Sequence, residues 1–289
     1  MPGRRSRHYD PTPLPADLRS LPVRLMGPGA PPQSISTVAF GDSAVESFLM
    51  IATLRLHYPD LPILVVCEPG LFDRFRKTGL PTRGLRFIPQ ITAYERSLRA
   101  KWVERFYDLE PAWDPAGLTY KMDAVSNALH RFSGTLFVDS DILFFEPPLV
   151  SDEPFILSEH QSGLEVWERK VGRFNAGFIG VRELYGFPSW WWHSFSETSR
   201  FFEQACLEEA AFRFEAVQFP NSENVGFWSC PSLWFRARSL HTHMLPGRRA
   251  HYPEPFNRLA ENLAEVADRR LREELGLGDL LDQIVCGKI

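Results

Sequence analysis

The stretch GTLFVDSDILFFEPP, residues 134–148, decides the fold of this chain. Its apolar runs 136–138 and 142–145 are typical of buried strands, but Asp139 and Asp141 stand between them. Ionised carboxylates are costly to remove from water unless a partner compensates them, and two neighbouring carboxylates also repel each other. The stretch therefore predicts that something in the folded protein compensates these two aspartates.

Strand-like and helix-like segments alternate before this stretch. Apolar, β-rich runs occupy residues 34–40, 61–67 and 85–89, and the segments 45–58 and 68–79 between them have the patterns of helices. This alternation predicts an α/β fold, with a mixed, mainly parallel sheet flanked by helices on both faces. Ligands of such sheets bind beyond the carboxyl ends of the strands, where Asp42 and the two aspartates should meet in one crevice.

The remaining segments predict further elements. These are helices at 94–107 and 120–132, strands at 153–159, 175–181 and 236–244, a mainly helical region at 188–214, and a charged amphipathic helix at 257–275. The last helix has an apolar stripe of Leu259, Leu263, Val266 and Leu271. We divide the chain into a Pro/Arg-rich N-terminal arm (1–33), a folded domain (34–255) and a C-terminal helical extension (256–289).

Composition excludes several classes of function. The chain has 289 residues, of which 44% are hydrophobic, so it can bury a sizeable core. Its net charge of -4, with arginines scattered along most of the chain, argues against a nucleic-acid partner. Four widely spaced cysteines without a CxxC pair indicate structural thiols in a reducing compartment. Because no apolar run is long enough for a transmembrane segment, we expect a cytoplasmic protein.

The DSD triplet has the geometry of a cation site. Residues i and i+2 of an extended chain point to the same side, so Asp139 and Asp141 present their carboxylates together while Ser140 faces away. Paired carboxylates suit Mg²⁺ or Mn²⁺, and Mg²⁺ is usually held by one or two carboxylates together with substrate phosphates. An acidic junction neutralised by nearby arginines is the alternative interpretation of the triplet.

The order of the motifs resembles that of a known group of enzymes. The DSD region, flanked by apolar strands and followed by EPP, resembles the DxD region of GT-A glycosyltransferases. RFNAGFIGVR (173–182) resembles the FNAG segment of glycosyltransferase family 8 and its glycogenin-like relatives, and FFEQACLEEA (201–210) stands where they carry an Asp-Gln pair. STVAFGDSAVESF (36–48) resembles their first strand and nucleotide-binding turn. The resemblance covers about residues 34–243.

This resemblance implies a GT-A (nucleotide-diphospho-sugar transferase) fold and a metal-dependent, hexosyltransferase-like glycosyltransferase. The donor would be a nucleotide diphosphate sugar, with a UDP-sugar favoured, and the acceptor a glycan, a small molecule or a protein. The resemblance places Mn²⁺ or Mg²⁺ on Asp139, Asp141 and His241. Since His241 and His243 alternate along an expected strand, only one of the two can face the metal.

The resemblance also implies the residues that contact the substrate. Besides Asp139, they are Ala39 and Asp42 in the nucleobase and ribose pocket, Lys121 near the phosphates or the donor sugar, and Asn175, Ala176 and Gly177 as the wall under the sugar. Glu203 and Gln204 match the pair beside the sugar ring and are the candidate catalytic residues, as base, nucleophile or ligand of a donor hydroxyl.

The chain departs from the family pattern at two places. Relatives follow the histidine with a GxxKPW-like signature whose lysine grips the diphosphate, whereas this chain has LPGRR (245–249), so Arg248 or Arg249 would substitute. The acidic member of the pair is Glu203 rather than aspartate. Both departures weaken assignment to one family more than assignment to the fold, and a retaining or an inverting outcome stays open.

Several of these residues also have simple structural interpretations. Lys121 has the position of a solvated helix residue, Asn175 that of a turn residue, and Glu203 and Gln204 those of first-turn helix residues. The run Trp190, Trp191 and Trp192 is more typical of a helix core than of a surface that stacks on sugars.

Two other functions are consistent with the motifs. A haloacid-dehalogenase-like phosphatase also uses an hhhDxD pattern, in which Asp139 would be the nucleophile. That family normally has its DxD on the first strand, however, whereas three expected strands precede it here. The second alternative is a catalytically inactive glycosyltransferase-like binding protein.

Overall fold

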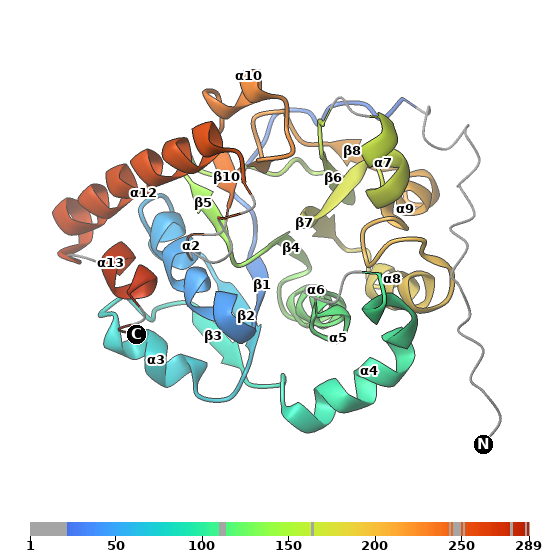
Figure 1. Ribbon diagram of the computed structural model, residues 1–289, viewed down its shortest axis with the longest axis horizontal. Helices are drawn as coiled ribbons and strands as arrows, with labels where there is room; N and C mark the ends of the chain where they lie inside the picture. Colours follow the sequence, from blue (N-terminus) through green and yellow to red (C-terminus); the bar gives the residue numbers. More distant parts are fainter. Residues whose placement is uncertain are drawn as a thin grey trace.

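The computed structural model describes residues 22–109, 114–162, 165–242, 244, 250, 252–277, 280–286 and 288. Within these residues a seven-stranded sheet has the order β3-β2-β1-β4-β7-β6-β8 (Figure 1). Its strands are β1 (Ile35–Ala39), β2 (Ile63–Cys67), β3 (Leu85–Ile88), β4 (Gly134–Val138), β6 (Phe155–Glu159), β7 (Phe174–Arg182) and β8 (Val217–Gln218).

The sheet is mixed but mainly parallel, as the alternating pattern predicts. Strand β1 pairs in parallel with β2 and with β4, and β2 pairs in parallel with β3. Strand β7 runs antiparallel to both of its neighbours, β4 and β6. Every residue of β1, β2 and β4 is buried, because helices cover both faces of this part of the sheet. The carboxyl ends of β1 and β4 therefore lie side by side at one edge.

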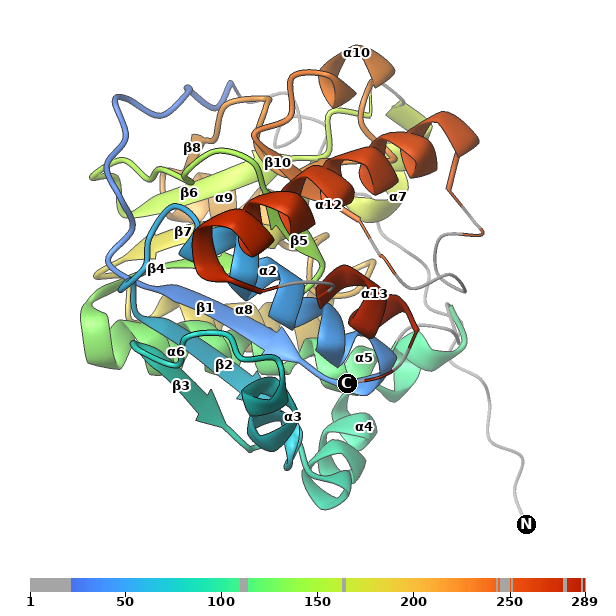
Figure 2. The same cartoon turned by 90° about the vertical axis from the view of Figure 1, so that its left-hand side faces the viewer.

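Helices cover both faces of the sheet (Figures 1 and 2), and a hydrophobic core lies under the helices on each face. The first core lies under α4 (Ala93–Tyr107), α6 (Tyr120–Phe132), α8 (Phe187–His193) and α9 (Leu207–Arg213). The second lies under α2 (Glu46–Arg55), α3 (Leu71–Lys77), α12 (Glu254–Leu275) and α13 (Leu280–Val285). Shorter helices are α5 (Pro115–Leu118), α7 (Glu165–Val171) and α10 (Pro231–Trp234), together with a 3-10 helix (Gly41–Val45) and a π-helix (Ser194–Thr198).

A small second sheet continues from the DSD triplet. It consists of β5 (Ile142–Phe144), β10 (Ser239–His241) and β9 (Val225–Gly226), in the order β5-β10-β9. Strand β10 is shorter than the expected strand at 236–244 and pairs antiparallel with β5, so that His241 lies opposite Ile142. This pairing brings His241 next to Asp141, the residue that precedes Ile142.

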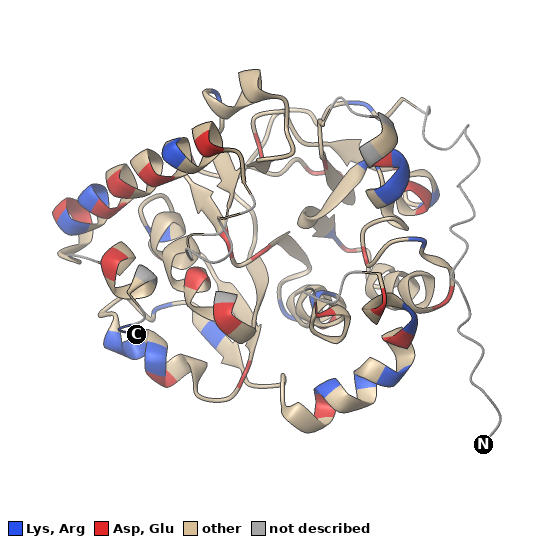
Figure 3. Cartoon of the chain, viewed as in Figure 1, with Lys and Arg blue, Asp and Glu red and all other residues tan. Residues whose placement is uncertain are grey.

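The C-terminal helix differs in part from its expected apolar stripe. The buried residues of α12 are Phe256, Ala260, Ala264, Ala267 and Leu271. Val266 is 46% exposed, so its place in the stripe is wrong. Charged residues recur along α12 (Figure 3), and most of them are exposed. Small alanines on the inner face allow this helix to pack closely against the core under it.

The interpretation of the Trp run as a helix core is confirmed for Trp191, which is fully buried, whereas Trp190 and Trp192 are partly buried against the same core. Residues 1–21 of the expected arm, and also His243, Arg248 and Arg249, lie outside the described residues. Among the described helices, none has both the length and the apolar character that a membrane span needs.

Candidate functional site

Two different strands hold the DSD triplet at the edge where β4 ends. The backbone N–H of Asp139 donates to the carbonyl of Gly177 on β7 at 2.8 Å. The carbonyl of Asp141 accepts from the N–H of Thr242, just after β10, at 3.0 Å. The triplet is therefore fixed between the large and the small sheet, so the positions of both aspartates depend on segments that follow them by more than thirty residues.

The two aspartates meet His241, as expected. Nε2 of His241 lies 3.1 Å from Oδ1 of Asp141 and 3.8 Å from Oδ2 of Asp139. One ligand atom from each of these three residues lies within 4.8 Å of the others. We call Asp139, Asp141 and His241 the acidic cluster. Two carboxylates and an imidazole form a donor set that suits Mn²⁺ or Mg²⁺.

Asn224 determines which nitrogen of His241 faces the aspartates. Nδ2 of Asn224 donates to Ser158 Oγ at 3.2 Å and to Asn175 Oδ1 at 3.1 Å. Its Oδ1, 2.9 Å from His241 Nδ1, must therefore accept a hydrogen bond from that nitrogen. With Nδ1 engaged by Asn224, Nε2 is the nitrogen that faces the two carboxylates, which is the position from which an imidazole ligates a cation. The cluster thus has the chemistry of a cation site.

Lys121 is buried in the site, so its interpretation as a solvated helix residue is wrong. Its side chain is 6% exposed, and Nζ lies 2.9 Å and 3.0 Å from the two carboxylate oxygens of Asp139. Nζ also lies 2.8 Å from Oε1 of Glu203. Burial alone would lower the pKa of Lys121, but the carboxylates of Asp139 and Glu203 outweigh it and raise this pKa above its ordinary value. Lys121 is therefore a charged link between the acidic cluster and Glu203.

Glu203 and Gln204 precede α9, which begins at Leu207, so their interpretation as first-turn helix residues is wrong. Both are buried, with exposed fractions of 3% and 8%. Oε2 of Glu203 has no hydrogen-bond partner among the described residues, although Oε1 is paired with Lys121. A buried carboxylate oxygen in this state is an acceptor that a ligand hydroxyl can use.

Gly177 and Asn175 lie on β7 directly beside the acidic cluster. Asn175 Oδ1 accepts from the N–H of Gly177 at 2.7 Å, so Asn175 braces the strand rather than a turn. A Cβ atom on Gly177 would lie 2.5 Å from Oδ2 of Asp139 and 2.7 Å from Cε1 of His241. Ala176 between them is buried. Only glycine leaves room for the cluster at this position.

The residues expected to contact the nucleotide, Ala39 and Asp42, lie at the same edge of the sheet. Ala39 is the last residue of β1 and is fully buried, and Asp42 is exposed in the 3-10 helix that follows. Since β1 and β4 are adjacent and parallel, these residues and the DSD triplet follow neighbouring strands. The pairing of β1 with β4 is therefore consistent with the prediction that Asp42 and the two aspartates lie close together.

Sequence reasoning did not identify three residues that surround His241. Asn224 orients it, the Trp228 ring packs against it in a T-shaped arrangement with centroids 4.9 Å apart, and His160 packs against Trp228 with centroids 5.8 Å apart. His160 Nδ1 lies 3.0 Å from the Gly172 carbonyl, which fixes its other nitrogen as the acceptor for Asn175. The only signal in the sequence was the polar run NSEN (221–224), which is equally typical of a turn.

Comparisons with known proteins identify the fold. No family profile matches the chain, and no curated protein matches its sequence. Among solved structures, an active-site mutant of the galactosyltransferase LgtC has a TM-score of 0.51 at 14% identity, covering 79% of this chain and 95% of that one. The glycosyltransferase GlyE of Streptococcus pneumoniae has a TM-score of 0.50 at 12% identity, covering 81% of this chain and 62% of that one. The expected GT-A fold is confirmed.

Proposed function

We propose that this chain is a metal-dependent glycosyltransferase that moves a sugar from a nucleotide diphosphate sugar to an acceptor. The acidic cluster carries the proposal, because it combines two carboxylates and an oriented imidazole at the ligand-binding edge of a GT-A fold. A UDP-sugar is the favoured donor, and the acceptor is a glycan, a small molecule or a protein.

Asp139, Asp141 and His241 would hold Mn²⁺ or Mg²⁺. When bound, such a cation neutralises the charge that develops on the departing diphosphate. Asn224 would keep the ligating nitrogen of His241 free of a proton. Lys121 would hold the carboxylate of Asp139 in place and add a fixed positive charge near the diphosphate.

The neighbouring residues would position the donor. Ala39 and Asp42 would contact the nucleobase and ribose, while Asn175, Ala176 and Gly177 would form a wall against which the donor sugar lies closely. We assign Glu203 and Gln204 to the reacting end of the sugar. The unpartnered Oε2 of Glu203 supports this assignment, since a sugar hydroxyl would satisfy it.

The geometry of Asp139 favours the transferase over the phosphatase alternative. A phosphatase nucleophile needs a carboxylate oxygen that is free to attack phosphorus. Both oxygens of Asp139 lie within 3.0 Å of Lys121 Nζ. Neither oxygen of Asp139 is therefore free of a charged partner, which argues against its role as a nucleophile.

Thermal unfolding with UDP or GDP, each with Mn²⁺ or with a chelator, tests the proposal. We expect the wild type to be stabilised only by metal and nucleotide together, by ~2.7 kcal/mol at a hundredfold excess over the dissociation constant. Asp141→Asn should lose the effect, and Asp73→Asn, an exposed acid on α3, should keep it. Absence of any shift with either nucleotide would contradict the proposal.

A further inference from the structure

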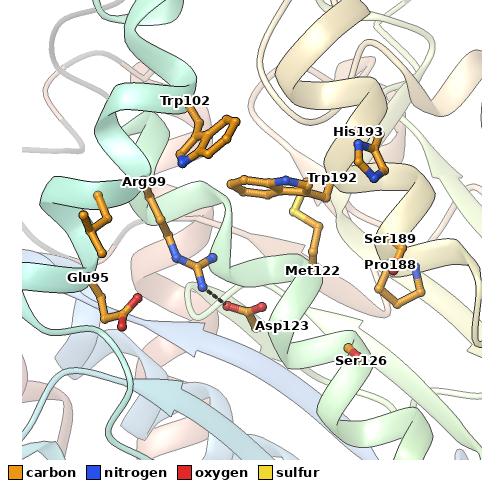
Figure 4. A pocket seen from close by; sticks show the side chains of 11 residues that line it. Glu95, Arg99, Trp102, Met122, Asp123, Ser126, Pro188, Ser189, Trp192 and His193 are labelled. Carbon is orange, nitrogen blue, oxygen red and sulfur yellow. Dashed lines mark hydrogen bonds and ion pairs between the residues drawn. The ribbon is translucent and has the colours of Figure 1, made fainter.

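A second site lies on the outer side of α6, apart from the acidic cluster. Helices α4, α6 and α8 line an open pocket of about 440 Å³ (Figure 4). This volume is in the range of small-molecule sites, roughly 300–1,000 Å³. Met122, Asp123 and Ser126 of α6 line it, whereas the preceding residue, Lys121, points to the cluster. Because successive helix residues point about 100° apart, the body of α6 separates the two sites.

Two tryptophans contribute to the apolar part of the pocket, together with Leu98, Met122 and Pro188. Trp102 comes from α4 and Trp192 from α8, and Figure 4 shows both above the ion pair of Arg99 and Asp123. Trp102 is 66% exposed, although its neighbour Val103 is buried in the core. An exposed indole in the lining of a pocket offers a large apolar face on which a ligand can pack. Its flat face is suited to the C–H face of a sugar ring.

The floor of the pocket is polar and already neutralised. Arg99 donates to Asp123 Oδ2 at 2.6 Å and to Thr119 Oγ1 at 3.1 Å, and its guanidinium lies 3.8 Å over the Tyr120 ring. These contacts hold Arg99 in one orientation. Since its charge is compensated and Glu95 adds a further negative charge to the lining, the pocket is poorly suited to a phosphate or a nucleotide.

The rim offers hydrogen-bonding groups of both kinds. Glu95 can accept, while Ser126, Ser189 and His193 can donate or accept. Sugar hydroxyls both donate and accept, so this lining matches a neutral saccharide better than a purely apolar ligand. A hydrophobic partner helix would leave these polar groups without partners.

We propose that this pocket binds a neutral saccharide unit, independently of the acidic cluster. Saccharide binding in this pocket does not depend on the proposed transfer reaction. The further role of tethering a glycan acceptor on the outer side of α6, while another part of it reacts, rests on that proposed function.

Saturation-transfer NMR tests the proposal. The probes are neutral trisaccharides of glucose, galactose, mannose or N-acetylglucosamine, added singly to the full chain. We expect at least one to bind the wild type and to bind Trp102→Ala about tenfold more weakly or worse. Trp102 is exposed, so the substitution should leave the fold intact, which the unfolding midpoint checks.

Two matched variants locate the binding. Tyr94→Ala removes another exposed aromatic side chain from α4 that does not line the pocket, and Asp141→Asn alters the acidic cluster; both should bind the saccharide as the wild type does. No binding by any of the four probes, equal binding by Trp102→Ala, or loss in Asp141→Asn would overturn the proposal. The stabilisation by nucleotide and metal is measured in a separate experiment. A failure of the proposed function and a failure of the saccharide site can therefore be told apart.

Discussion

The carboxylate of Asp139 occupies the space in which a side chain on Gly177 would begin. Oδ2 of Asp139 lies 2.5 Å from the ideal Cβ position of Gly177, and the N–H of Asp139 donates to the carbonyl of the same glycine at 2.8 Å. This backbone hydrogen bond continues the β4–β7 pairing, so neither residue can move away without disturbing that pairing. A methyl group at residue 177 must therefore displace the acidic cluster.

We expect Gly177→Ala to weaken metal binding and to lower the free energy of unfolding by about 1–3 kcal/mol, the usual cost of overpacking. Calorimetric titration with Mn²⁺ and urea unfolding measure the two effects. Gly186→Ala is the matched control, because a Cβ there meets nothing within 4 Å and its φ of -79° suits alanine. Unchanged Mn²⁺ affinity in Gly177→Ala would contradict the close approach.

Lys121→Met should destabilise the protein strongly, because it leaves the carboxylates of Asp139 and Glu203 buried without their shared cation. Breaking a buried ion pair from one side costs about 3–5 kcal/mol. Urea unfolding at neutral pH measures this loss. The exposed Lys101→Met should change stability by less than about 0.5 kcal/mol, and an equally small effect of Lys121→Met would argue against a buried link.

Asn224→Gly should lower the affinity for Mn²⁺ by roughly 10–100-fold, the usual effect of removing a partner that orients a metal ligand. Asn224 has a φ of +55°, which glycine adopts without strain, so the loss would come from the missing side-chain hydrogen bonds to His241, Asn175 and Ser158, of which the first orients the metal ligand. Glu215→Gly, at an exposed residue with a φ of +50°, is the control. Titration of each variant with Mn²⁺ decides the matter, and equal affinities would show that Asn224 does not orient His241.

His160 predicts an acid-sensitive contribution to stability. Burial lowers its pKa to about 4, against the opposing effect of hydrogen bonds with the backbone of Gly172 and Arg173. Because the unfolded chain has the higher pKa, about 6.5, it binds more protons, and stability falls as the pH drops from about 6.5 towards 4. Between about pH 7.5 and pH 5 the wild type should lose about 2 kcal/mol more than His160→Gln.

The control for this effect is His193→Gln, whose side chain is 70% exposed. Its urea unfolding should have the pH dependence of the wild type. If His160→Gln also retained the wild-type pH dependence, His160 would not be the group responsible.

Much of the fold could be predicted because its signals are local. The apolar runs of β1, β2 and β4 and the helix pattern of α2 depend on residues close together in the chain. The exposed Val266 of α12 shows the limit of such patterns: an apolar residue near the edge of a stripe is buried only if another element covers it.

The sequence by itself determined the alternation of strands and helices and the position of Asp139 and Asp141 at a strand end, since a period of two and a break in an apolar run are properties of the chain alone. Only the tertiary structure decided that Lys121 is buried between Asp139 and Glu203, that Asn224 orients His241, and that Trp102 and Trp192 line one pocket. Each of these arrangements joins residues far apart in the chain, and their proximity depends on how whole elements pack rather than on any local pattern.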